Sequence, residues 1–319
     1  MMNPVLTSAK FIAENSDLVQ IDDAAAKRFA QTFSEEHVAH WFNQAPIDIS
    51  CLSESERLNF LLVCNAVSFS YWGRPKWTIQ YQGRPLDGAY GMMAALFRRI
   101  EEKEFELTPE SLSKLNRTKF SHILRGNVEI PLLDERLKHI RECGAGLLAS
   151  KSRDLSEIIE QSNYDAMLLL EKIINRFPSF NDTSTFKGKT CFFHKRAQLL
   201  VSDIANVFQK KKIGKLKNLH LLTGLADYKV PQILREKGIL LYSKPLANQV
   251  DNQKLLIRDS QEENEIRGNT VYALEKIADE VRKKYPAITP IHVNDHLWLA
   301  TQIKHPDWRP YHLVRTTSY

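Results

Sequence analysis

The sequence has few of the residues that build a metal centre, a disulfide framework or a phosphate loop. Its 319 residues include four cysteines, Cys51, Cys64, Cys143 and Cys191, which lie far apart in the chain. This spacing argues against a paired-cysteine metal site and indicates reduced core cysteines. The twelve glycines form no glycine-rich phosphate loop, and no Gly-x-Ser-x-Gly segment marks a serine hydrolase. We therefore expect neither a metal nor a cofactor.

Long apolar runs are also missing. No stretch approaches the 18 apolar residues of a membrane-spanning helix, and the N-terminus lacks the basic-then-apolar pattern of a signal peptide. The net charge is +6, from 44 basic and 38 acidic residues. This excess is compatible with an anionic ligand but is too diffuse to demand nucleic acid. We expect a cytoplasmic protein that makes no membrane contact.

The hydrophobic pattern predicts a mainly α, multi-helical fold. Apolar residues recur at helical spacing in about a dozen segments, among them residues 4–15, 24–33, 53–67, 88–102, 132–143, 164–177, 232–237 and 262–281. One small β-hairpin is expected, because residues 77–81 alternate at period two and Gln82-Gly83 turns them toward 84–87. We expect residues 1–319 to form a single domain, built either as one body or as two helical lobes with the ligand cleft between them.

The stretch from His220 to Gly238 breaks the local pattern. An apolar segment that includes Leu225 is followed by Asp227, Tyr228 and Lys229. Pro231 then favours the first turn of a new helix. Asp227 therefore lies at or just before a helix start, where unpaired N–H groups favour an anion. It is either a helix cap only or a fixed negative charge awaiting a developing positive one.

Six short motifs, in order, give the sequence a recognisable signature. They are Lys10-Phe-Ile-Ala-Glu-Asn15, Phe69-Ser-Tyr-Trp72, Lys195-Arg-Ala-Gln198, Ala226-Asp-Tyr-Lys-Val-Pro-Gln232, Glu265-Ile-Arg-Gly268 and Leu297-Trp298. From about residue 8 to the C-terminus, the chain resembles the queuosine salvage protein family. The resemblance implies an all-helical fold similar to helical DNA glycosylases. It also implies an N-glycosylase that hydrolyses queuosine 5′-monophosphate and releases the base queuine for salvage into tRNA.

The resemblance also assigns roles to individual residues. Asp227 is the implied catalytic carboxylate, because breaking a ribosyl C–N bond builds positive charge on the sugar. Tyr228 and Trp72 are candidates for stacking on the base. Lys195 and Lys229 are expected to bind the phosphate. The other expected substrate-binding residues are His40, Leu225, Asn294, Asp295 and Trp298.

The sequence departs from the family pattern at one of these positions. The family carries an acid four residues before the tryptophan of Leu297-Trp298, where this chain has Asn294 and places the acid at Asp295. One residue is about 100° of rotation on a helix. Either Asp295 points into the pocket or Asn294 supplies an amide there. The pattern predicts that Asn294→Asp is tolerated or even improves queuine binding, because it restores the family pattern.

A non-catalytic helical module that binds a nucleotide or RNA is the alternative function. The basic residues Lys187, Lys189, Lys195 and Arg196 and the segment 210–217 favour it. The resemblance instead implies a small-molecule substrate and no stable nucleic-acid complex. Salt dependence separates the two, since binding to a phosphate backbone weakens steeply with salt.

Overall fold

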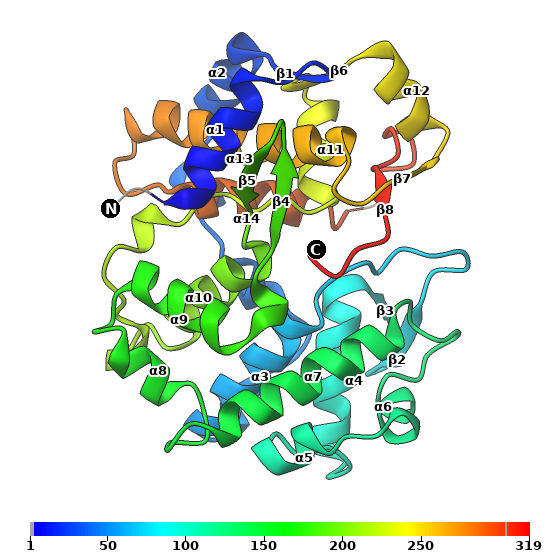
Figure 1. Ribbon diagram of the computed structural model, residues 1–319, viewed down its shortest axis with the longest axis vertical. Coiled ribbons are helices and arrows are strands. Elements are labelled where there is room, and N and C mark those ends of the chain that lie inside the picture. The colour runs from blue at the N-terminus through cyan, green and yellow to red at the C-terminus, as the bar shows by residue number, and fades with distance from the viewer. Residues whose placement is uncertain (1–2, 304) are drawn as a thin grey trace.

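The computed structural model describes residues 3–303 and 305–319. Helices dominate it, as predicted, and they gather into an upper and a lower half with the C-terminal segment running between them (Figure 1). The α-helices are α1 (Pro4–Glu14), α2 (Asp23–Gln31), α3 (Glu54–Ala66), α4 (Gly88–Glu101), α5 (Pro109–Ser113), α6 (Arg117–Ile123), α7 (Leu133–Leu148), α8 (Ser156–Gln161), α9 (Ala166–Arg176), α10 (Lys195–Val207), α11 (Lys229–Glu236), α12 (Lys244–Asp251), α13 (Gln261–Arg282) and α14 (Pro290–Ala300).

The strands are short and pair two by two. They are β1 (Val19–Ile21), β2 (Thr78–Tyr81), β3 (Arg84–Asp87), β4 (Thr183–Phe186), β5 (Lys189–Phe192), β6 (Leu240–Tyr242), β7 (Leu255–Leu256) and β8 (Leu313–Val314). The predicted hairpin is β2 paired with β3, and its register places Tyr81 opposite Arg84. Antiparallel β1–β6 and parallel β7–β8 join segments that are far apart in the sequence.

The expectation of a single hairpin is wrong, because β4 and β5 form a second one where the sequence indicated a loop. Ser184 and Phe186 are buried and alternate with more exposed neighbours. The turn residues Lys187 and Gly188 both have positive φ, at 45° and 78°, which matches the twist of a two-residue hairpin turn. The alternation of buried and exposed residues in β4 is only four residues long and lies beside polar turn residues, so the sequence gives little sign of a strand there.

Helix starts follow their local capping signals. Ser53 and Glu56 form a capping box at the start of α3, in which the Ser53 N–H donates to Glu56 Oε2 at 2.9 Å. Asp22 caps α2, and Thr108 caps α5 ahead of Pro109. In each case a Ser, Thr or Asp side chain accepts the hydrogen bond of an otherwise unpaired N–H group in the first turn.

The Glu265-Ile-Arg-Gly268 motif ties α13 to its surroundings. Glu265 accepts hydrogen bonds from the N–H groups of Asp17, Leu18 and Val19 at 3.1, 2.6 and 3.0 Å. A Cβ at Gly268 would meet Ile12 of α1 at 2.5 Å, so the two helices approach too closely there for a side chain. We infer that this motif holds the scaffold together.

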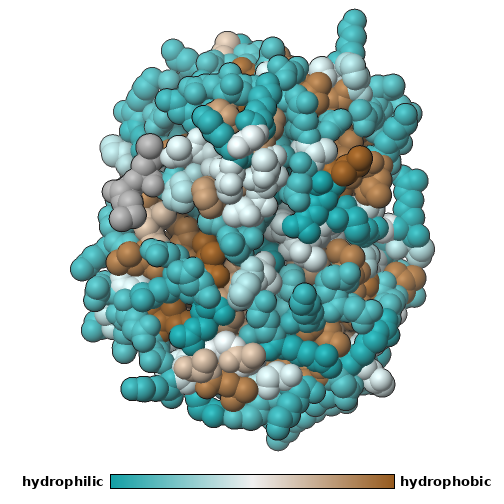
Figure 2. Space-filling model, viewed as in Figure 1, coloured by the Kyte–Doolittle hydropathy of each residue, from teal (hydrophilic) through white to brown (hydrophobic). Residues whose placement is uncertain are grey.

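Two large hydrophobic clusters form the core. One is built mainly from α3, α4, α7, α9 and α10, and the other from α2, α11, α13 and α14, with Trp298 packed against both. The face seen in Figure 2 is mostly hydrophilic, with hydrophobic groups in scattered patches. Among residues 3–303 and 305–319, no helix combines the length and the apolar character needed to cross a membrane.

Candidate active site

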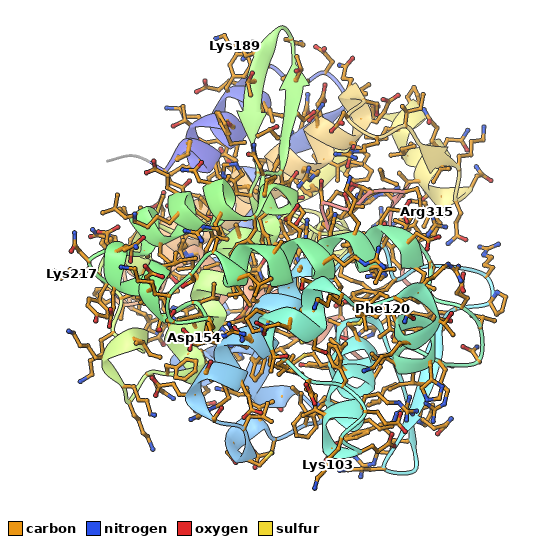
Figure 3. The ribbon with its side chains drawn as sticks, turned by 60° about the horizontal axis from the view of Figure 1, so that its bottom comes forward. Lys103, Phe120, Asp154, Lys189, Lys217 and Arg315 are labelled. Atoms are coloured by element: carbon orange, nitrogen blue, oxygen red, sulfur yellow. The ribbon has the colours of Figure 1, made fainter. Side chains whose placement is uncertain are left out.

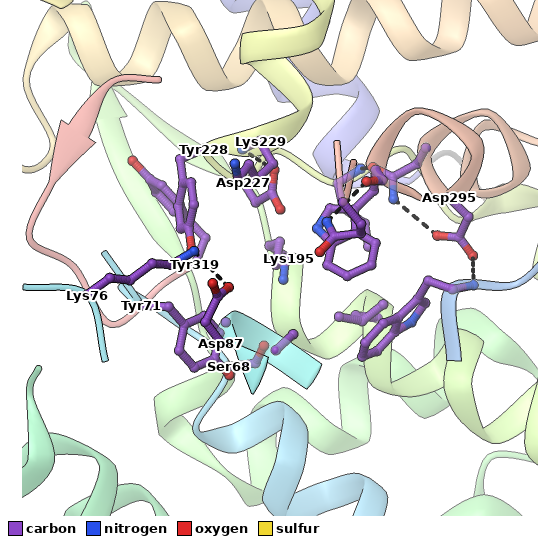
Figure 4. Close-up of a pocket in the computed structure, with 18 residues that line it drawn as sticks. Ser68, Tyr71, Lys76, Asp87, Lys195, Asp227, Tyr228, Lys229, Asp295 and Tyr319 are labelled. Atoms are coloured by element: carbon purple, nitrogen blue, oxygen red, sulfur yellow. Dashed lines mark hydrogen bonds and ion pairs between the residues drawn. The ribbon is translucent and has the colours of Figure 1, made fainter. Parts of the chain in front are cut away.

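A pocket that is partly open to solvent lies where the two clusters meet, and its space of about 730 Å³ includes the solvent at its mouth (Figure 4). Its wall draws on residues from many parts of the chain. They are Trp41, Ser68, Tyr71, Lys76, Asp87, Gly88, Ala89, Lys195, Leu199, Leu225, Asp227, Tyr228, Lys229, Asn294, Asp295, Trp298, Gln302 and Tyr319. Eight of the ten predicted site residues are therefore brought together in one cavity.

Three helices begin at this pocket. The first residues of α4, α10 and α11 are Gly88, Lys195 and Lys229, and all three line the wall. A helix N-terminus carries a partial positive charge from its unpaired N–H groups. Two of these N-termini add a lysine side chain, so the pocket is suited to an anionic ligand.

Asp227 is fixed at the start of α11, as predicted. Its Oδ1 accepts hydrogen bonds from the N–H groups of Lys229 and Val230, both at 2.8 Å. No hydrogen bond to Oδ2 occurs within the part of the chain that the structure describes, and the residue is 8% exposed. Asp227 is thus both a cap and a carboxylate with one oxygen free to face a ligand.

Lys195 lies in the middle of the pocket (Figure 4) and is 8% exposed, without an ion pair among the described residues. Burial lowers its pKa, while the nearby charge of Asp227 acts in the opposite direction. A bound anion would relieve the cost of this buried charge.

The outer part of the pocket holds a second group of charges. Lys229 Nζ lies 4.9 Å from the centre of the Tyr311 ring, and burial together with the charge of Lys76 lowers the pKa of Lys229. Lys76 Nζ forms an ion pair with Asp87 at 2.7 Å. Tyr228 packs on Tyr311 with ring centres 4.7 Å apart.

The opposite end combines an acid with aromatic rings. Asp295 Oδ2 accepts a hydrogen bond from the Trp41 N–H at 3.2 Å, and burial raises the pKa of Asp295 to about 7. Trp298 meets the Trp41 ring edge-on at 5.4 Å between ring centres. Rings beside a carboxylate are a suitable environment for an organic cation.

Asn294 and Asp295 both line the pocket, so the two positions are not alternatives. Asn294 Oδ1 accepts a hydrogen bond from the Leu225 N–H at 3.0 Å, and its Nδ2 donates to Asp295 Oδ1 at 3.3 Å. Asn294 thus fixes the segment before Asp227 and supports the neighbouring acid with an amide.

Two predicted residues lie outside the pocket wall. Trp72 carries the Arg315 guanidinium over its ring at 3.6 Å, and Tyr71 is the aromatic residue of this segment that lines the cavity. His40 lies behind the wall, where its Nε2 contacts Ser202 Oγ at 3.2 Å. Neither residue is among those that line the cavity, and their contacts with the substrate remain predictions.

Several pocket residues had no usable signal in the sequence. Tyr319 reaches the wall from the C-terminal segment, and Lys76 and Asp87 meet only because the β2–β3 hairpin folds back. Tyr71, in contrast, lies in the Phe69-Ser-Tyr-Trp72 motif, from which Trp72 was selected as the stacking residue. Trp41 lines the pocket next to His40, the residue of this segment that was predicted to bind the substrate. The spacing of His292 and His296 on α14 resembles that of helical metal ligands, but His296 stacks on His37 at 4.3 Å and His292 caps its own helix.

The expectation that Asn294→Asp is tolerated is revised by these contacts. The variant keeps an acceptor for Leu225 but replaces the amide donor to Asp295 with a second carboxylate. A second carboxylate beside Asp295 raises the pKa of Asp295 further above its unfolded value. The variant's loss of stability is therefore small at low pH, where the carboxyl is protonated, and grows as pH rises through about 7. We expect a loss of about 1–3 kcal/mol at pH 8 and much less at pH 5, measured by thermal unfolding.

Asn294→Ala is the control for this comparison. It removes the Leu225 acceptor and the donor to Asp295 without adding a charge, so its loss of stability should vary less with pH. A melting temperature of Asn294→Asp at pH 8 that equals or exceeds that of the wild type would contradict the revised prediction.

Comparison with known proteins agrees with the resemblance. The model of the family described as queuosine salvage protein matches residues 49–319. The chain is 34% identical over 324 residues to the queuosine 5′-phosphate N-glycosylase/hydrolase of Sphaerobacter thermophilus, covering 99% of this chain and 97% of that protein. Proteins of the same name from Bos taurus and Mus musculus are 29% and 28% identical, covering 98% and 100% of this chain and 97% and 100% of those proteins. The chain belongs to the queuosine salvage protein family.

Proposed function

We propose that this protein hydrolyses the N-glycosidic bond of queuosine 5′-monophosphate and releases queuine. The observation that carries the proposal is the Asp227 carboxylate, held by two backbone N–H groups with one oxygen free to face the pocket. Relatives named for this activity align along nearly the whole chain. The ligand cleft lies between two helical lobes of one domain in this proposal.

The reaction consumes one water and gives queuine and ribose 5-phosphate. The C–N bond breaks with its electron pair going to the base, and positive charge builds on the sugar. Asp227 stabilises that charge, or attacks the sugar, or orients the water. The base takes up a proton as it leaves, and because queuine is a 7-deazapurine, ring position 7 offers no nitrogen for it.

The two ends of the pocket suit the two ends of this substrate. Queuine carries a secondary amine that is cationic at neutral pH, which matches Asp295 with Trp41 and Trp298. The 5′-phosphate is a dianion, which matches Lys229 and Lys195 at two helix N-termini. Asp227 then lies near the sugar.

The alternative of an RNA-binding module has weaker support. Lys187 pairs with Asp17 at 2.9 Å, Lys189 lies over the Phe11 ring at 4.1 Å, and Lys211 pairs with Glu54. In Figure 3, Lys189 lies at the β4–β5 hairpin and Lys217 in a different part of the molecule, so these basic residues form no single stripe. A small-molecule substrate without a stable nucleic-acid complex, in the cytoplasm, remains our prediction.

Incubation with queuosine 5′-monophosphate tests the function, with release of free queuine as the readout. Asp227→Asn keeps the Oδ1 acceptor for Lys229 and Val230, so the fold should persist while the charge is lost. We expect turnover to fall by a factor of about 10²–10³, the cost of about 3–4 kcal/mol of electrostatic stabilisation. A variant that keeps more than about a tenth of the wild-type rate would remove Asp227 from this role.

The phosphate assignment is tested by comparing two substrates. Lys229→Ala and Lys195→Ala should each raise KM for the monophosphate by about tenfold or more, because a charge-assisted hydrogen bond is lost. KM for the unphosphorylated nucleoside should change little. Lys189→Ala, outside the pocket, serves as the control and should alter neither value. Equal effects on both substrates would rule out phosphate contact.

The base end is tested with Asp295→Asn, which keeps an acceptor for the Trp41 N–H and removes the charge. Queuine binding should weaken by about 2–4 kcal/mol, the scale for a buried cation left unpaired. Calorimetry with an analogue that lacks the aminomethyl side chain provides the comparison, and its affinity should change little. An equal loss for both ligands would show that Asp295 does not meet the amine.

A further inference from the structure

A second buried acid, Asp203 of α10, lies behind the Trp41 wall of the pocket. Its Oδ1 accepts a hydrogen bond from the indole Nε1–H of Trp41 at 2.8 Å, and its Oδ2 accepts one from Asn65 Nδ2 at 2.7 Å. The residue is 0% exposed and forms no ion pair with lysine or arginine among the described residues. A fully buried carboxyl with only neutral hydrogen-bond partners needs an explanation, since neutral donors repay little of its desolvation.

Trp41 links this acid to the pocket. Its indole N–H binds Asp203, its backbone N–H binds Asp295 at 3.2 Å, and its carbonyl accepts a hydrogen bond from the Tyr90 hydroxyl at 2.9 Å. The Trp41 and Tyr90 rings are nearly parallel, with an interplanar angle of 18°. Trp41, which lines the end of the pocket assigned to the base, is thus held by hydrogen bonds to two carboxyl groups.

His40 lies between the same two acids. Its Nε2 is 3.8 Å from Asp203 Oδ1 and 3.9 Å from Asp295 Oδ2. The Phe42 N–H donates to Nδ1 at 3.3 Å, so Nδ1 carries no proton. Burial lowers the pKa of His40 to about 3, so the ring is neutral with its proton on Nε2, and it cannot supply a positive charge to either acid.

Few other charges act on the two carboxyls. The titratable and charged groups that face them from the surrounding elements are His40 before Trp41, Cys64 of α3, Tyr90 of α4 and Lys195 of α10, and His292 of α14 acts on His40. Lys195 is the one cation among them, and it acts on both acids. Two buried carboxyls therefore compete for one lysine, and burial raises the pKa of each to about 7.

We propose that Asp203 is a positioning residue of the active site, which holds Trp41 in the wall and shares one proton with Asp295 across His40 and Trp41. The proposal rests on the proposed function, in which Asp295 meets the cationic amine. In the free protein the proton is divided between the two carboxyls. When the amine binds at pH 7, Asp295 ionises and its share of about half a proton goes to the solvent, while the share on Asp203 stays there. The negative charge then lies on the side that faces the ligand.

The test is the pH dependence of queuine binding, followed by calorimetry for the wild type and Asp203→Asn. Affinity for a cation needs ionised Asp295, so in the wild type it should rise about tenfold from pH 6 to pH 8 for a midpoint near 7. Removing the Asp203 charge lowers the pKa of Asp295. If the midpoint of Asp203→Asn moves to about pH 6, the rise in its affinity for queuine between pH 6 and pH 8 should be only about twofold.

Trp41→Phe is the matched control, because it removes the indole N–H from Asp203 and keeps both acids and an aromatic wall. It should lower affinity at every pH without moving the midpoint toward acid. A purely structural role for Asp203 predicts the same behaviour for Asp203→Asn, with a lower melting temperature and an unmoved midpoint. That result would overturn the proposal while leaving queuine binding and the proposed function in place.

The wild-type protein provides a test that does not depend on the variant folding. Queuine binding at pH 7, measured in two buffers of different ionisation enthalpy, should release about half a proton. The analogue without the aminomethyl side chain should release almost none. Queuine binding without proton release would overturn the shared proton, whereas absence of queuine binding at any pH would overturn the proposed function as well.

Discussion

The pair of hydrogen bonds from the Lys229 and Val230 N–H groups to Asp227 Oδ1 is the contact on which the site depends. It starts α11, fixes the carboxylate, and determines where Lys229 leaves the backbone. Leu225, two residues earlier, is held by Asn294 of α14. The same short segment therefore places an acid, a cation and an aromatic ring, and connects them to the base end of the pocket.

The pocket concentrates charges that are costly to bury. Lys195, Asp203 and Asp295 are all at least nine-tenths buried, and none has an ion pair with an oppositely charged side chain among the described residues other than the His40 contacts. Such an arrangement lowers stability in the empty protein. Elsewhere in the fold, a buried charge is matched directly, as where Arg267 of α13 pairs with Asp182 at 2.5 Å. The contrast indicates that the pocket is arranged for a ligand that carries both signs of charge.

The parts of the fold that the sequence predicted are those with local signals. The helix predicted over residues 53–67, the β2–β3 hairpin and the position of Asp227 at a helix start each depend on residues within a few positions. The β1–β6 and β7–β8 pairs join distant segments by backbone hydrogen bonds, which leave no composition signal in either segment. Tyr319 and Asp203 were missed for the same reason, because their roles come from neighbours supplied by other elements. The resemblance to helical DNA glycosylases remains a prediction.

The most direct test of the account is a crystal structure of Asp227→Asn with queuosine 5′-monophosphate bound. The account predicts that the base lies against Trp41 and Trp298 with its amine at Asp295, that the sugar carbon of the N-glycosidic bond faces residue 227, and that the phosphate contacts Lys229 or Lys195. A substrate bound in the reverse direction, or with the sugar turned away from residue 227, would contradict it.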